Sequence, residues 1–168
     1  MILIIILILA IVGLDQWTKY LAVEHLMGEA SYPFLEDVLH FTYVENRGAA
    51  FGMLSDHRWV FMILSSAAIL ILLFWLWKEK PQSIWIRLAS AFIVGGGIGN
   101  MIDRVRLGYV VDFIDVRFID FYVFNVADSF VCVGCALFLL WAVCTELKPK
   151  KKTDASPQTP ETTDEVGE

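Results

Sequence analysis

Four long apolar runs, separated by polar segments, restrict what this chain can fold into more than any other feature. They cover residues 2–22, 59–77, 84–102 and 125–143, and the second run contains no charged residue. About 20 consecutive apolar residues are enough for a helix to cross the hydrocarbon core of a bilayer. Hydrophobic residues make up 57% of the chain, against roughly 45–50% in soluble domains. The sequence therefore predicts an all-α integral membrane protein with four transmembrane helices.

The chain divides into a membrane domain, residues 1–145, and a tail, residues 146–168. The tail is polar, with proline, threonine, serine and charged residues, and such a composition predicts a disordered segment. The first apolar run lacks the basic start and the small-residue cleavage site of a secretory signal peptide, so we interpret it as a retained span.

A small exposed β element is expected between the first two spans. Val38–Val44 (VLHFTYV) is rich in β-branched and aromatic residues, which favour strands. Two further extended pieces are predicted at Tyr109–Ile114 and Val116–Ile119, in the second polar loop.

The distribution of basic residues predicts the orientation of the spans. Four lysines follow the last span, and with Lys78, Lys80 and Arg87 they make seven basic residues on one side against six on the other. Several of the six belong to the candidate site described below. The positive-inside rule then places both termini in the cytoplasm. Both large polar loops, and the β element, are expected at the outer face.

Polar side chains are concentrated in residues 95–129, which start inside one apolar run and end at the start of another. Charged groups at a membrane boundary are costly and generally face the interior of the helix bundle. Asn100, Asp103 and Arg104 share one helix face, and we expect them to support a site. Gly95 and Gly99 form a G-x-x-x-G pattern, which allows close helix packing in lipid.

An aspartate pair is the chemistry that this stretch favours. Two carboxyl groups that lie close together cannot both ionise cheaply, so they share one proton. The ionised group can activate water, and the protonated group can polarise a carbonyl. Asp112 and Asp128 lie sixteen residues apart, and a loop of that length can bring them together without requiring it. Asp128 alone could equally be explained by the dipole of a helix start.

Several alternatives follow from the same residues. The three histidines lack the spacing of a zinc site, so no metal or other cofactor is expected. A Ser129–Lys19 nucleophile pair would require a desolvated lysine. Asp15 and Lys19, at i and i+4, form either a boundary ion pair or a support for the site. Asn46 lies either in a solvated turn or against a bound peptide.

A small transporter or lipid-binding protein, with acids lining a polar path, is the alternative function.

Five motifs occur in order among the four spans. They are DQWTK from Asp15, NRGAAFG from Asn46, GGGIGNMIDR from Gly95, GYVVDF from Gly108 and FNVADS from Phe124. Together they closely resemble the lipoprotein signal peptidases, also called signal peptidase II, over roughly residues 10–130. The segment FIDFYV before the last motif lacks the Trp-Pro lead-in of many members, so the shape of that loop is left open.

The resemblance implies a bacterial cytoplasmic (inner) membrane aspartyl endopeptidase whose active site lies at the outer face. Its substrates would be diacylglyceryl-modified prolipoproteins, which it would cut before the lipidated cysteine to remove the signal peptide. Asp112 and Asp128 would form the catalytic dyad. Membrane lipid and a cyclic peptide inhibitor of the globomycin type are the other implied partners, and no nucleic acid is expected. The supporting or substrate-binding positions would be Asp15, Asn46, Gly48, Asn100, Asp103, Arg104 and Asn125.

Overall fold

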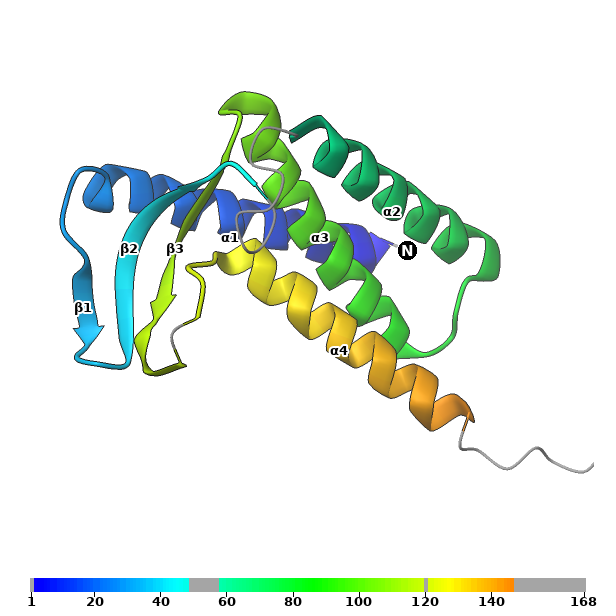
Figure 1. The fold of residues 1–168 in the computed structure, drawn as a ribbon. Helices are drawn as coiled ribbons and strands as arrows, with labels where there is room; N and C mark the ends of the chain where they lie inside the picture. Colours follow the sequence, from blue (N-terminus) through cyan, green and yellow to red (C-terminus); the bar gives the residue numbers. More distant parts are fainter. Residues whose placement is uncertain (1, 49–57, 120, 147–168) are drawn as a thin grey trace, which may run out of the picture.

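The computed structural model describes residues 2–48, 58–119 and 121–146, which form a bundle of helices with a small sheet beside one end (Figure 1). Its four long helices are each long and apolar enough to cross a membrane, which confirms the predicted spans. Both α1 and α3 continue past the predicted span ends at residues 22 and 102. The bounds are α1 (Ile2–Leu26), α2 (Arg58–Glu79), α3 (Ile84–Arg106) and α4 (Val126–Glu146).

Helix α3 lies at the centre of the bundle and contacts the other three helices (Figure 1). Half of its most apolar window is buried, against 6–17% in the other three. Helices that face lipid leave most of their apolar side chains without protein contacts, as α1, α2 and α4 do here. Their exposed surface is therefore the surface that a bilayer would cover.

Glycines let α3 approach its neighbours closely, as the G-x-x-x-G pattern predicts. A Cβ added at Gly95 would lie 2.9 Å from Ile11 Cγ2 of α1. A Cβ at Gly96 would collide with the carbonyl oxygen of Ala127 in α4. These two positions bring the start of α4 and the middle of α1 to the same height on α3.

The sheet has three antiparallel strands in the order β1-β2-β3. Strands β2 (Leu39–Asn46) and β3 (Val110–Val116) confirm two of the predicted extended segments, with shifted ends. The third prediction, Val116–Ile119, is wrong, because Arg117–Ile119 form a 3-10 helix. Strand β1 (Tyr32–Leu35) was not predicted. It is a four-residue edge strand that contains a proline and is exposed throughout. A short exposed segment with a proline is difficult to recognise as a strand from sequence.

The second half of α1 supports the sheet. Ala22 of α1 forms a buried cluster with Val111 and Phe113 of β3, and Val23 and Leu26 pack against it. This packing fixes β3 over the end of the bundle from which α4 starts. We call this end the sheet end of the bundle.

Some predictions concern residues outside the described part of the chain. They are the disordered tail, of which the structure describes only Glu146, and most of the NRGAAFG motif, of which it describes residues 46–48.

Candidate active site

Asp112 and Asp128 come from different elements and meet at the sheet end of the bundle. Asp112 lies in the middle of β3 and is 1% exposed, while Asp128 lies in the first turn of α4. Asn125 links them, because its Nδ2 donates to Asp112 Oδ1 at 2.6 Å and its Oδ1 accepts the backbone N–H of Asp128 at 2.9 Å. One amide side chain therefore sets the position of both aspartates.

Asn125 can do this because it precedes α4 as its N-cap. A capping asparagine characteristically accepts a backbone N–H from the first turn with its side-chain oxygen, as Asn125 does from Asp128. The backbone N–H of Asn125 in turn points to Asp128 Oδ2, at 3.4 Å. The capping interaction thus leaves the Asn125 amide nitrogen free to reach across to β3.

Two further asparagines orient the aspartates. Asn46, at the end of β2, donates from Nδ2 to Asp112 Oδ2 at 2.9 Å. Asn100 of α3 donates from Nδ2 to Asp128 Oδ1 at 2.7 Å. With the contacts of Asn125, each of the four carboxyl oxygens now has an amide donor. These donors are neutral, so they fix the carboxyl groups without adding positive charge.

The surroundings of Asp112 favour its protonated form. Burial raises the pKa of the Asp112 carboxyl to about 6, and the negative charge of Asp128 acts in the same direction. The hydrogen bonds from Asn46 and Asn125 oppose this shift. A buried carboxyl beside a second carboxyl retains its proton well above the usual aspartate range. The pair can therefore hold one proton between two groups.

Lys19 of α1 contacts three of the residues that surround the two aspartates. Its Nζ lies 3.0 Å from Asp15 Oδ2 and 2.9 Å from Asp103 Oδ2, and it donates to Asn100 Oδ1 at 2.7 Å. Lys19 and both aspartates are buried. The Asp15–Lys19 pair is thus an internal ion pair rather than a solvated one, and through Asn100 it reaches Asp128. The i,i+4 spacing in DQWTK was the signal for this pair.

The two aspartates beside Lys19 also hold backbone groups of other elements. Asp15 Oδ1 accepts the N–H of Ala127 at 2.9 Å, at the start of α4. Asp103 Oδ2 accepts the N–H of Val111 at 3.1 Å, next to Asp112 in β3. Gln16 Nε2 donates to Asp103 Oδ1 at 2.9 Å. Gln16 was not among the predicted site residues; its one signal was a polar side chain beside Asp15 at the end of an apolar run.

Arg104 and Gly48 complete the set of predicted residues. Gly48 is buried, and its N–H donates to Asn46 Oδ1 at 3.1 Å. Arg104 directs Nη2 to the Gly48 carbonyl at 3.5 Å and Nη1 to the Asn100 carbonyl at 3.4 Å. All nine predicted site residues therefore belong to one connected network.

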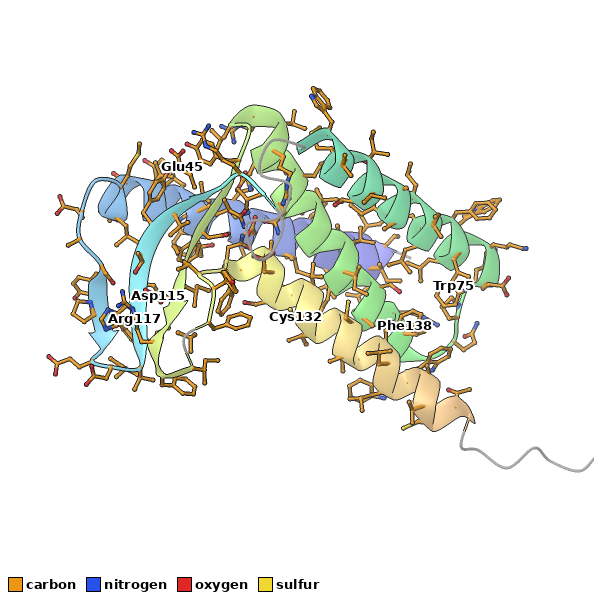
Figure 2. All side chains as sticks on the ribbon, in the orientation of Figure 1. Glu45, Trp75, Asp115, Arg117, Cys132 and Phe138 are labelled. Carbon is orange, nitrogen blue, oxygen red and sulfur yellow. The ribbon has the colours of Figure 1, made fainter. Side chains whose placement is uncertain are left out.

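Asp115 belongs to a separate cluster, although it lies in the same polar stretch. It lies on the sheet beside Arg117 (Figure 2), whose Nε donates to Asp115 Oδ2 at 2.8 Å. Thr42 Oγ1 donates to the same oxygen at 2.8 Å. These contacts stay within the sheet and its loops, and Asp115 was not among the predicted site residues.

Comparison with known proteins identifies the family. The family model described as signal peptidase (SPase) II matches residues 7–144. The lipoprotein signal peptidase of Caldanaerobacter subterraneus subsp. tengcongensis is 49% identical over 133 residues, which cover 79% of this chain and 90% of the relative. That of Clostridioides difficile is 42% identical over 146 residues, covering 87% and 98%.

The fold is shared with a solved bacterial membrane enzyme. Its structure, obtained by the in meso method at 2.3 Å resolution, superposes with a TM-score of 0.83 at 31% identity, covering 89% of this chain and 92% of that one. A second bacterial membrane enzyme structure gives a TM-score of 0.76 at 32% identity. This is a multi-pass membrane protein with the architecture of a peptidase, which removes the support for the transporter alternative. The chain belongs to the signal peptidase II family.

Proposed function

We propose that this protein is an aspartyl endopeptidase that removes the signal peptide from diacylglyceryl-modified prolipoproteins, cutting before the lipidated cysteine. The observation that carries the proposal is the pair of aspartates bridged by Asn125, with bonds of 2.6 Å to Asp112 and 2.9 Å from the Asp128 backbone. Family membership supports the substrate class, since the relatives are lipoprotein signal peptidases.

The chemistry follows from one proton on two carboxyl groups. The ionised aspartate removes a proton from a water molecule, whose oxygen attacks the scissile carbonyl carbon. The protonated aspartate donates its proton to the carbonyl oxygen, which gives a neutral tetrahedral intermediate. When the C–N bond breaks, the carboxyl group that took the proton from water protonates the departing amine, and the other carboxylate takes a proton from a hydroxyl group of the intermediate. The carboxylic acid product then forms, and the dyad again holds one proton. Burial and the charge of Asp128 raise the pKa of Asp112 to about 6, so Asp112 can hold the shared proton and act as the acid of this cycle.

Substrate binding would use the lipid as well as the peptide. The acyl chains of the substrate would stay in the bilayer, while the peptide reaches the dyad at the sheet end of the bundle. Asn46 binds Asp112, and Gly48 binds Asn46; both residues would hold the peptide backbone. Binding energy from the lipid can then hold the scissile bond against the dyad. A globomycin-type cyclic peptide would compete for the same position.

The proposed location is the bacterial cytoplasmic membrane, with both termini in the cytoplasm. Lys78 at the end of α2 and Lys80 just after it lie at the end of the bundle opposite the sheet, and four further lysines follow α4 in the sequence. The positive-inside rule favours that end as the cytoplasmic one. The dyad would then face the outside of the cell, where a translocated precursor arrives.

Cleavage of matched substrates tests the function. The purified protein is incubated with a diacylglyceryl-modified prolipoprotein and with the same precursor lacking the lipid, and the products are identified by mass spectrometry. We expect one cut, directly before the modified cysteine, and at least a tenfold loss of kcat/KM without the lipid. Equal cleavage of both precursors would refute the role given to the lipid, and no cleavage of either by folded protein would refute the function.

A further inference from the structure

The segment between β3 and α4 exposes four large apolar side chains within five residues. Phe118, Ile119, Phe121 and Tyr122 are 66%, 57%, 53% and 54% exposed. We call these four side chains the 118–122 patch. Exposed apolar side chains grouped in this way mark a place where a protein meets a membrane or another apolar partner.

The position of the patch along the chain places it at a membrane boundary. Tyr122 lies four residues before Val126, the first residue of α4 and of a candidate span. Figure 1 shows the segment returning beside β3 on the side of the sheet that faces α4. An isolated antiparallel β-bridge between Ile114 and Phe124 also places the end of this segment beside β3.

The neighbouring helices carry exposed aromatic side chains near the same height. Ala127 at the start of α4 is level with Asp15 of α1, because its N–H binds that carboxylate. Trp17 and Tyr20, just beyond Asp15, are 60% and 61% exposed. Trp59, at the sheet end of α2, is also exposed. Tryptophan and tyrosine concentrate where the hydrocarbon core meets the headgroups, so these side chains indicate that the bilayer boundary lies near the start of α4, which the 118–122 patch precedes in the chain.

Backbone hydrogen bonds tie the patch to β3. The N–H of Ile114 donates to the Phe124 carbonyl at 2.8 Å, and the N–H of Phe124 returns to the Ile114 carbonyl at 3.0 Å. Phe121 N–H reaches the Val116 carbonyl at 3.4 Å, and the rings of Phe121 and Phe124 lie 5.9 Å apart, edge to face. A force on the patch is therefore transmitted to the strand that carries Asp112.

We propose that the 118–122 patch inserts into the interfacial layer of the leaflet at the sheet end of the bundle. The partner is bilayer lipid, and the contact holds β3 at a constant height above the start of α4. Apolar and aromatic side chains that lie in the interface gain free energy in proportion to the apolar area they bury. This inference concerns the membrane contact alone and does not depend on which bond the protein cuts.

Depth measurement with spin labels tests the proposal. The native cysteines, Cys132, Cys135 and Cys144, are free and exposed, so they are first replaced by alanine. Single cysteines are then introduced as Phe118→Cys, Phe121→Cys and, for comparison, Glu36→Cys in the exposed turn between β1 and β2. Each is labelled and reconstituted in phosphatidylglycerol–phosphatidylethanolamine vesicles. For each spin label, the rate of collision with oxygen, which concentrates in lipid, is compared with the rate of collision with a nickel chelate, which stays in water.

The expected result is a ratio of oxygen to nickel collisions several-fold higher at positions 118 and 121 than at position 36. Equal ratios at all three positions would overturn the proposal, because the patch would then face water. Low collision with both reagents at 118 and 121 would also overturn it, because the patch would then be covered by protein, for example by a second copy. Unchanged thermal unfolding of each labelled variant shows that the fold is retained.

Discussion

Lys19 shows how one buried side chain can hold several parts of a site in place. It contacts Asp15 in its own helix, and Asp103 and Asn100 in α3. Asp15 binds the start of α4, and Asp103 binds β3. Four elements therefore depend on the charge of one ammonium group.

Removal of this ammonium group should destabilise the protein strongly. Lys19→Met leaves two buried carboxylates without their cation, and breaking a buried pair in this way costs about 3–5 kcal/mol. The control is Arg117→Met, which removes a half-exposed partner of Asp115 and should cost about 1 kcal/mol or less. Thermal and denaturant unfolding in detergent measure both. Similar losses of free energy of unfolding in the two variants would contradict an internal role for Lys19.

The pKa of Asp112 predicts how stability changes with pH. This pKa is raised from the ordinary value to about 6, so the folded state binds the proton more tightly than the unfolded state. The resulting stabilisation is complete below about pH 4 and is lost as pH rises through 6. Asp112→Asn removes it, so the variant should gain on the order of 3 kcal/mol relative to wild type between pH 4 and pH 7. Melting temperatures in detergent across this range check the sign, and a constant difference between the two proteins would contradict it.

At the residue scale, the structure brings together the predicted site residues that fall in motifs. The nine predicted positions form one network because the motifs lie at helix ends and strand positions that the fold brings together. The connecting role of Asn125 could not be predicted, since it depends on the cap of α4 facing β3. Lys19 was left between two interpretations, because spacing alone does not reveal burial.

At the scale of elements, the contact between α3 and α4 determines where Asp128 lies. Gly96 faces the Ala127 carbonyl, and Gly99 faces Asp15 and Ala127. A side chain at Gly96 would push the first turn of α4, which carries Asp128, away from α3, and one at Gly99 would displace Asp15, whose carboxylate binds the N–H of Ala127. The glycines therefore set the distance between Asn100 and the dyad.

A matched pair of glycine substitutions tests this contact. Gly96→Ala places a methyl group against backbone that cannot yield, and overpacking of this kind costs about 1–3 kcal/mol. Gly13→Ala, in α1, meets no atom within 4 Å and should be neutral or stabilising by up to about 1 kcal/mol, because alanine favours helix. We expect lower melting temperature and cleavage rate in the first variant only. Equal behaviour of the two would show that the helices are not held at this contact.

The helices were easier to predict than the sheet. Apolar runs of about 20 residues identify spans from composition alone. Strand β1 is short, exposed and contains Pro33, and it exists because it pairs with β2. Arg117–Ile119 contain an aromatic and a β-branched residue, which are common in strands, but β3 ends at Val116 and the chain turns back toward α4. Local sequence does not encode such tertiary pairings.

At the scale of the whole molecule, the orientation in the membrane can be tested by labelling from one side. In a cysteine-free background, Glu36→Cys lies in the turn between β1 and β2, and Gln82→Cys lies in the short turn between α2 and α3, at the opposite end; both positions are exposed. A membrane-impermeant thiol reagent applied to intact cells should label position 36 and leave position 82 unlabelled until the cells are lysed. The reverse pattern would place the dyad on the cytoplasmic side.

The most direct test of the account is the cleavage rate of three asparagine variants on one lipidated prolipoprotein. Asp112→Asn and Asp128→Asn each remove one carboxyl of the pair, and Asp115→Asn alters a buried aspartate of the same strand that contacts Thr42 and Arg117 instead. We expect losses of at least about 10²- to 10⁴-fold in the first two, the range for removal of a general acid or base. The third should keep its rate within a few-fold. Retained cleavage in either dyad variant, with folded protein confirmed by its melting temperature, would contradict the aspartyl mechanism.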